Sequence, residues 1–252
     1  MASEIRRMIV GSICLLAVSG GIALPALAAP VAFGSITATY CQSGWPVSTT
    51  IDSSFSSSNG WAIDPQEGNN QTAVYKTATD INNPSGTQLV FNLHMLYNSD
   101  HLLGRFRLAA TTSGRGLYGQ GTECADASPG GTAVWNVLVP QSVVSANGQT
   151  LTVQPDGSIL ASGSLPGTDV VTVRFTTQLQ GITGFRLEAL ADGSLPYGGP
   201  GRNSSNGNFV LTEFVADAQS QAPVPTLTTL AMVLTSMLLG SVAMLWLRRR
   251  HG

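Results

Sequence analysis

Short apolar runs separated by turn-forming residues fill the middle of this chain, and they constrain its fold more than any other feature. Nine runs of strand length, rich in Val, Leu, Thr and Phe, lie between residues 30 and 221, and none continues with helical periodicity. Each is bounded by Gly, Asn, Asp, Ser or Pro, as strands usually are. Asp156-Gly157 between two runs is a hairpin signal. The pattern predicts an all-β fold, an antiparallel β-sandwich.

Alternation within the run LGRFRLAAT (103–111) predicts which of its side chains are buried. Phe106 and Leu108 point to one face of a strand, and Arg105 and Arg107 point to the other. Because an unpaired buried arginine is costly, we expect Phe and Leu in the core. The arginines then stand outside, braced by carboxylates. TGFRLEAL (183–190) repeats the F-R-L-x-A pattern, either as a second half of a repeat or by chance.

The N-terminus has the three parts of a secretory signal peptide. Arg6 and Arg7 precede a mostly apolar stretch, residues 8–24, and Ala26-Leu27-Ala28 is an A-x-A cleavage site. We therefore expect residues 1–28 to be removed by signal peptidase. The alternative is an uncleaved anchor helix.

The C-terminus predicts one transmembrane helix. Residues 227–247 are 21 residues without a charge, and Arg248, Arg249 and Arg250 follow at once. At about 1.5 Å per residue this stretch spans a hydrocarbon core of about 30 Å, in contact with membrane lipid. The positive-inside rule places the arginines in the cytoplasm and the body outside the inner membrane.

The residues before that helix resemble a sorting signal. Val224-Pro225-Thr226-Leu227, at the end of a linker (219–226), precede the helix and arginine tail of residues 227–252. This order resembles the IPTL-CTERM signal of the wider PEP-CTERM class, with Val in place of Ile. The resemblance implies cleavage near the motif by an exosortase-like membrane protease and transfer to the cell surface or extracellular matrix. A permanent single-span anchor is the alternative.

The two body cysteines bear on the redox compartment of the chain, and the net charge of the body bears on the class of its partner. Cys41 and Cys124 lie in the body, and an exported chain meets an oxidising compartment, so a disulfide between them is one alternative and two free thiols the other. Between residues 30 and 226 there are 13 acidic and 7 basic residues, a net charge of about −6. A nucleic-acid partner needs a basic patch, so this class is excluded.

Two body segments, residues 31–112 and 133–218, flank a Gly-rich linker or loop at residues 113–132. Their motifs QSGWPV, GWAIDP, LGRFRL, SLPYGGPGR and GNFVLTEF resemble segments of large secreted bacterial proteins of unassigned function. The elements Ile51-Asp52-Ser53 and Gly60-Trp61 resemble those of galactose-binding-like (discoidin or F5/8C-type) domains, with Ser53 where Gly is usual. This resemblance implies a jelly-roll β-sandwich that binds glycans or other surface polymers. The segments form either one sandwich or two.

Aromatic side chains in polar loops are the candidate glycan contacts, because sugar rings stack on them. The large amphipathic ones are Trp45, Trp61, Tyr97, Tyr118, Trp135 and Tyr197. Trp61 with Asp64 and Asn69 is the first choice, although Trp61 could instead fill the core. Tyr197 and Arg202 in the Gly/Pro loop 194–208 are the second.

No catalytic motif is present. The chain has no HExxH metal site, no GxSxG elbow and no phosphate loop. Asp52, Asp64 and Glu213 could hold one structural calcium ion, and we expect no other cofactor. The sequence therefore favours a non-catalytic, exported surface or matrix protein that binds polysaccharide. The alternatives are a purely structural or adhesive matrix protein and a glycoside hydrolase that uses a carboxylate pair.

Overall fold

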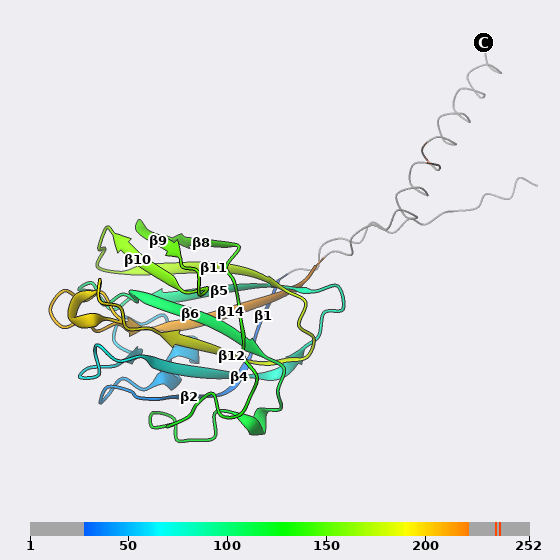
Figure 1. Cartoon of the computed structure of the whole chain (residues 1–252), viewed down its shortest axis with the longest axis horizontal. Coiled ribbons are helices and arrows are strands. Elements are labelled where there is room, and N and C mark those ends of the chain that lie inside the picture. Colours follow the sequence, from blue (N-terminus) through cyan, green and yellow to red (C-terminus); the bar gives the residue numbers. More distant parts are fainter. Residues whose placement is uncertain (1–27, 222–234, 236, 238–252) are drawn as a thin grey trace, which may run out of the picture. The chain divides into compact units, whose positions relative to one another are not determined.

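Two antiparallel sheets pack face to face in a computed structural model that describes residues 28–221, 235 and 237 (Figure 1). Within these residues the structure contains no helix that is long and apolar enough to cross a bilayer. The predicted signal peptide up to residue 27, the motif Val224–Leu227 and the arginine tail lie outside the described residues, as does nearly all of the expected span. Residues 25–223 form a compact unit with its own core.

The first sheet has five strands. Their order across the sheet is β1 (Ala29–Pro30), β14 (Glu213–Ser220), β5 (Thr87–Met95), β11 (Asp169–Thr177) and β8 (Ser142–Ser145). Every pairing is antiparallel, and the longest, β5 with β11, runs in register from Thr87↔Thr177 to Met95↔Asp169.

The second sheet has seven strands. Their order is β2 (Phe33–Ala38), β4 (Gln71–Ile81), β12 (Ile182–Ala189), β6 (Arg105–Thr111), β10 (Ile159–Gly163) and β9 (Gln149–Val153), while β7 (Asn136–Val137) also pairs with β6. A small third sheet pairs β3 (Trp61–Ala62) with β13 (Val210–Leu211). The described residues also include three short 3₁₀ turns, η1 (Val47–Ile51), η2 (Arg115–Leu117) and η3 (Pro196–Gly198).

Both sheets contain strands from both sequence segments. In the first sheet β5 lies between β14 and β11, and in the second β12 lies between β4 and β6. The two segments therefore share one core. The two F-R-L strands, β6 and β12, are direct neighbours, with Leu108 opposite Leu187.

The core lies between the sheets and follows the strand alternation. Leu89, Phe91 and Leu93 of β5 are fully buried, whereas the residues between them are partly exposed. The Phe91 ring packs edge-on against Phe185 of the opposite sheet, with 5.0 Å between centroids. Burying such rings is the main favourable contribution to folding.

The prediction for β6 is confirmed. Phe106 and Leu108 are buried, while Arg105 donates to Asp156 and Asp192 at 2.9 and 3.1 Å. Arg107 pairs with Glu188 of β12 at 2.7 Å. The arginines are thus an ion-pair network on the outer face of the seven-stranded sheet rather than a ligand grip.

The Gly-rich stretch 113–132 packs onto that same outer face. Tyr118 is fully buried and donates its hydroxyl to the Thr183 carbonyl at 2.8 Å. The sequence left the pairing of Cys41 and Cys124 open, and the structure shows the disulfide, with 5.0 Å between Cα atoms. This bond ties the stretch to the end of β2.

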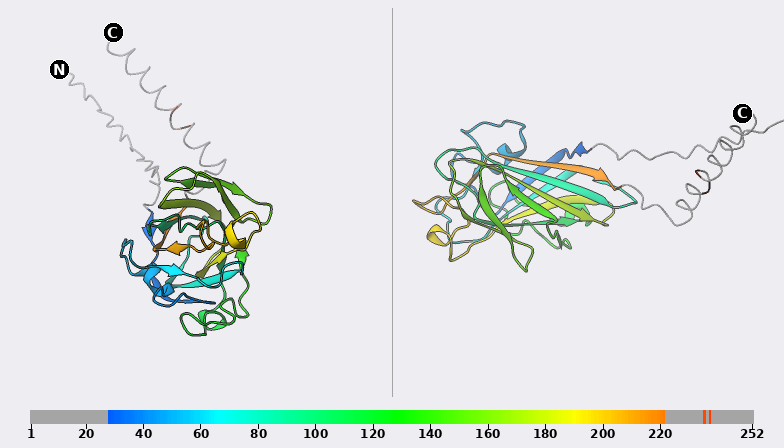
Figure 2. Two further views of the ribbon diagram at one scale, coloured as in Figure 1. Left: turned by 90° about the vertical axis from the view of Figure 1, so that its left-hand side faces the viewer. Right: turned by 90° about the horizontal axis from the view of Figure 1, so that it is seen from above.

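The connections differ between the two ends of the sandwich. The end where β5 finishes and β14 begins, here called the loop end, carries the connections 39–70, 96–104, 146–148, 164–168 and 190–212 (Figures 1 and 2). The opposite end, here called the terminal end, carries the tight connections 82–86 and 178–181. It also holds both ends of the described body, because β1 pairs with the last residues of β14.

Candidate functional site

Side-chain hydrogen bonds hold the long connections of the loop end together. The Asn208 amide accepts from the backbone N–H of Ile63 at 3.0 Å and donates to Gln42 at 2.9 Å. It therefore joins connection 190–212 to connection 39–70. A methyl group in place of the Gly201 hydrogen would overlap the Asn208 backbone, so the return of this loop requires glycine. The loops are thus fixed rather than free.

Three aromatic side chains from two connections form a partly exposed group, here called the aromatic cluster. Trp45 lies edge-on to Tyr97, with 5.0 Å between ring centroids. Tyr97 lies edge-on to His101 at 4.9 Å. The cluster presents ring surface at the edge of the loop end, where stacking on a flat apolar ligand face is feasible.

Polar groups beside the aromatic cluster are held in fixed positions. Asn203 donates to Asp100 at 2.7 Å and to the Ser99 carbonyl at 2.9 Å. Ser204 donates its hydroxyl to the other Asp100 oxygen at 2.9 Å. The Asp100 carboxylate is therefore oriented by the neighbouring loop rather than by solvent.

Backbone strain is confined to the loop end. Among the described residues, four non-glycine residues have a positive φ: Ser53 (63°), Ser99 (66°), Asp100 (58°) and Tyr197 (53°). All four lie in the long connections. Such conformations cost about 1–3 kcal/mol each and cluster at functional sites. The loop end is therefore the part of the fold in which unfavourable backbone conformations lower the free energy of unfolding.

Three of the predicted site residues, Asp64, Asn69 and Tyr197, lie on neighbouring loops. Tyr197 is 68% exposed, and the two loops are joined by a hydrogen bond from the Gly68 N–H to the Gly199 carbonyl at 2.5 Å. Asn69 is exposed. Burial raises the pKa of Glu67, and the nearby Asp64 carboxylate raises it further. The structure thus brings Asp64, Asn69 and Tyr197 to one side of the loop end.

Trp61 is not accessible, so its predicted role as an aromatic platform is wrong. Its side chain is completely buried, and its indole N–H donates to the Tyr40 carbonyl at 2.8 Å. The ring packs edge-on against Phe209 at 5.1 Å. Trp61 is therefore a core residue beneath the loop end, as the alternative interpretation of the sequence held.

Arg202 is buried as well, at 8% exposure. Its guanidinium donates to Gln149 and to the carbonyls of Ser164 and Gly163, at 2.5, 2.8 and 3.0 Å. Burial lowers its pKa, against the opposing effect of Asp169. Arg202 therefore braces the loops from within. It also lines a cavity of about 280 Å³ beside η3.

The three predicted calcium ligands do not assemble as a set. Asp64 lies beside Glu67, and no group of three or more His, Cys, Asp or Glu side chains within the described part of the chain could hold a metal ion. Asp52, however, lies near Glu213, which is 4% exposed. Burial, with a contribution from Asp52, raises the pKa of Glu213 to about 7.

One oxygen atom of this pair and one of the neighbouring Asn59 have no hydrogen-bond donor. The Glu213 Oε2 and Asn59 Oδ1 atoms are buried and accept no hydrogen bond. The Asn59 side-chain amide donates through Nδ2 to the Asp52 carboxylate at 3.2 Å. Carboxylate and amide oxygens are the donors that Ca²⁺ prefers. Asp52, Asn59 and Glu213 therefore fit a hard cation in donor chemistry, and Asp64 does not belong with them.

Comparison with protein-family models finds no match, and comparison of the sequence with curated proteins finds none. Similar folds occur among solved structures. One is CBM32-3 from a family 31 glycoside hydrolase of Clostridium perfringens, with a TM-score of 0.39 and 10% identity over 72% of this chain and 89% of that one. Another is from the Streptococcus pneumoniae β-galactosidase BgaA, with a TM-score of 0.41 and 11% identity over 77% and 99%. The similarity concerns the general arrangement of strands.

Proposed function

We propose that this chain is an exported, non-catalytic protein of the cell surface or extracellular matrix that binds carbohydrate at its loop end. The observation that carries the proposal is the aromatic cluster of Trp45, Tyr97 and His101, set beside strained and internally braced loops. Aromatic faces with a few fixed polar groups are the usual means of recognising a sugar ring. The proposal rests on these residues and not on the distant structural similarities.

Each group has a distinct role in this proposal. Trp45 and Tyr97 supply the apolar surface on which a sugar ring stacks. Asp100, already oriented by Asn203 and Ser204, accepts from sugar hydroxyls. Because these groups are held before the ligand arrives, binding loses little conformational entropy. Tyr197, Asp64 and Asn69 extend the surface on the adjoining loops.

Two carboxylates of the sandwich, Glu188 and Asp100, are engaged in ways that suit structure better than hydrolysis. Glu188 is bound by Arg107 at 2.7 Å and Arg186 at 3.3 Å, and Asp100 by Asn203 and Ser204. A glycoside hydrolase needs two carboxyl groups facing each other across a bound sugar. These observations favour binding without catalysis.

The Cys41–Cys124 disulfide supports an extracellular location, since such bonds persist in oxidising compartments. In the proposal, signal peptidase removes residues 1–28, and an exosortase-like protease recognises Val224 to Leu227 before transfer to the surface. Mass spectrometry of the mature protein tests this. Recovery of chains that still contain residues 227–252 would mean that the span is a permanent anchor.

A glycan array probed with residues 25–223 tests the binding proposal. We expect binding to defined glycans, lost by at least tenfold in Trp45→Ala and Tyr97→Ala and retained in Leu117→Ala. Leu117 is a suitable control because it is 49% exposed on the stretch 113–132, away from the loop end. If no glycan binds, the structural or adhesive alternative replaces the proposal.

A further inference from the structure

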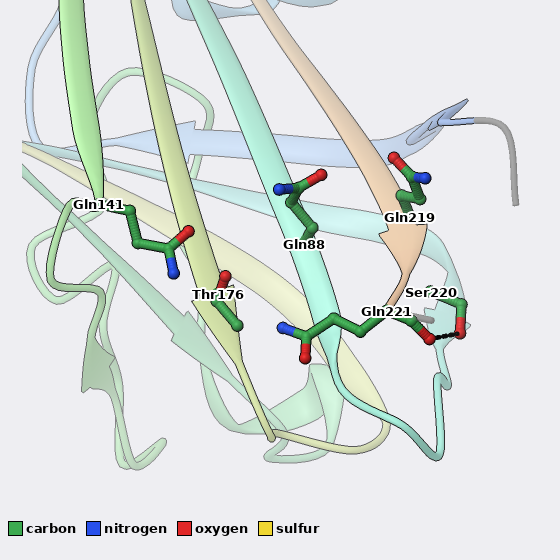
Figure 3. Close-up of a pocket in the computed structure, with 6 residues that line it drawn as sticks. All are labelled: Gln88, Gln141, Thr176, Gln219, Ser220 and Gln221. Atoms are coloured by element: carbon green, nitrogen blue, oxygen red, sulfur yellow. Dashed lines mark hydrogen bonds between the residues drawn. The ribbon is translucent and has the colours of Figure 1, made fainter. Parts of the chain in front are cut away.

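A polar groove lies on the outer face of the five-stranded sheet, next to the terminal end and away from the aromatic cluster. Six residues line it, namely Gln88, Gln141, Thr176, Gln219, Ser220 and Gln221, around a volume of about 430 Å³ (Figure 3). This amide groove contains no charged and no aromatic side chain. It differs in both respects from the loop end.

Strand register builds the amide groove. Gln88 of β5 is paired with Thr176 of β11 on one side and with Gln219 of β14 on the other. Directly paired residues project from the same face, so these three side chains form one row across the sheet. Their chain neighbours Leu89 and Phe175 point the other way, into the core. The backbone positions of the row are therefore set by the same strands that form the core beneath it.

Two further glutamines complete the amide groove from outside the row. The Gln141 N–H donates to the Arg174 carbonyl at 2.8 Å, just before β8, and the Gln221 N–H donates to the Gly86 carbonyl at 3.0 Å, just after β14. Figure 3 shows the Gln221 amide extending toward Thr176 and the Gln141 side chain entering from the other side.

The hydrogen-bonding groups of the amide groove are largely unused. The four glutamine side chains make no hydrogen bond to any described residue, and the one side-chain hydrogen bond among the lining residues runs from the Ser220 hydroxyl to the Gln221 backbone carbonyl at 3.3 Å. Each amide offers two N–H donors and one oxygen acceptor. The groove therefore presents donors and acceptors side by side with no net charge.

We propose that the amide groove is a second ligand site, which binds a segment of an uncharged polysaccharide chain. Sugar hydroxyls both donate and accept, which matches adjacent amides, whereas an anionic polymer would find no cation among the lining residues. In the next row Val90 lies between Arg174 and Asp217, so the surrounding face adds one charge of each sign. An extended peptide would instead add to the edge of a sheet through its backbone.

The second site does not depend on the loop-end site. If both bind polysaccharide, each molecule can hold two chains at once, and the domain becomes a cross-linker of the matrix. Linked sites raise the apparent affinity for a polymer well above that of either alone.

Affinity electrophoresis of residues 25–223 in gels containing dextran, galactomannan, hydroxyethylcellulose or alginate tests the proposal. We expect retardation by at least one neutral polymer and none by alginate. The double variant Gln88→Ala with Gln219→Ala should weaken that retardation at least tenfold. Gln154→Ala is the matched control, because Gln154 lies in the β9–β10 turn outside the groove. Gln88→Leu, which keeps the volume and removes the amide, should act like the double variant.

Three outcomes would overturn the proposal. The first is unchanged retardation of the glutamine variants, or no retardation of the wild type by any neutral polymer. The second is a preference for alginate. The third is concentration-dependent dimerisation that the glutamine variants abolish, which would make the groove an interface between copies. Trp45→Ala separates the two sites. This variant should still be retarded by the polymer that binds the amide groove, whether or not the loop end binds a glycan.

Discussion

Trp45 and Trp61 are 16 residues apart and belong to the same long connection, yet they lie in two differently built regions. Trp61 is sealed in the core, with its N–H donating to Tyr40 and its ring against Phe209. Trp45 lies on the partly exposed aromatic cluster with Tyr97. Immediately beneath the loop end the molecule is close-packed, and at its surface the backbone is strained and the rings of the aromatic cluster are partly exposed. The difference separates residues that maintain the fold from residues free to bind.

The largest effect on stability should follow from Trp61→Ala. Removing a fully buried large aromatic side chain costs about 3–5 kcal/mol, because packing is lost and a cavity remains. Urea unfolding measures this directly. A loss below about 1 kcal/mol would mean that Trp61 is not part of the core.

The disulfide should have the next largest effect. Cys41→Ser with Cys124→Ser opens a loop of 83 residues, and losing such a cross-link costs about 2–4 kcal/mol. Thermal unfolding of the variant and of the reduced wild type should agree. Equal melting temperatures with and without reductant in the wild type would contradict this expectation.

Glu213 should make stability depend on pH. Its pKa in the folded chain is about 7, above its ordinary value of 4.5, so folding favours the protonated form. Its stabilising contribution is complete below about pH 4.5 and is lost as pH rises through 7, by up to about 3 kcal/mol. Urea midpoints from pH 4 to 8 should show this fall in the wild type and a smaller one in Glu213→Gln.

Added calcium gives a second test of the group around Glu213. If Asp52, Asn59 and Glu213 hold Ca²⁺, added calcium at pH 8 should raise the melting temperature of the wild type. At a concentration about 100 times the dissociation constant the gain is about 2.7 kcal/mol. Glu213→Gln should show no gain, and Asp64→Asn, whose side chain lies elsewhere, should respond like the wild type.

The smallest effect should come from the partly exposed ion pairs. Arg107→Gln removes the 2.7 Å contact with Glu188 on the outer face of the seven-stranded sheet. Partly exposed pairs contribute about 0–1 kcal/mol, and salt screens them. A double-mutant cycle with Glu188→Gln isolates the pair, and a coupling above about 2 kcal/mol would show that the network maintains the fold.

Strand-level features of this molecule were predictable from sequence, and its loop-level features were not. The period of two in residues 103–111 fixed the buried side of β6, because alternation is a local property. Trp61 lies in a strand of two residues, too short for any period to show its side. Trp45 and Tyr97 meet only because two long connections converge, and no local pattern in the sequence shows that contact. The sequence names Asp52, Asp64 and Glu213 together as calcium ligands, but the fold brings Asp52 near Glu213 and Asp64 near Glu67, because the three residues lie at separate points of the loop end.

The most direct test of the account is one comparison of the two tryptophans. Glycan binding and urea unfolding should be measured for Trp45→Ala and the wild type of residues 25–223. The account predicts that Trp45→Ala loses at least tenfold in glycan affinity while its free energy of unfolding changes by less than about 1 kcal/mol, as expected for a partly exposed side chain. Full affinity in a stably folded Trp45→Ala protein would contradict it.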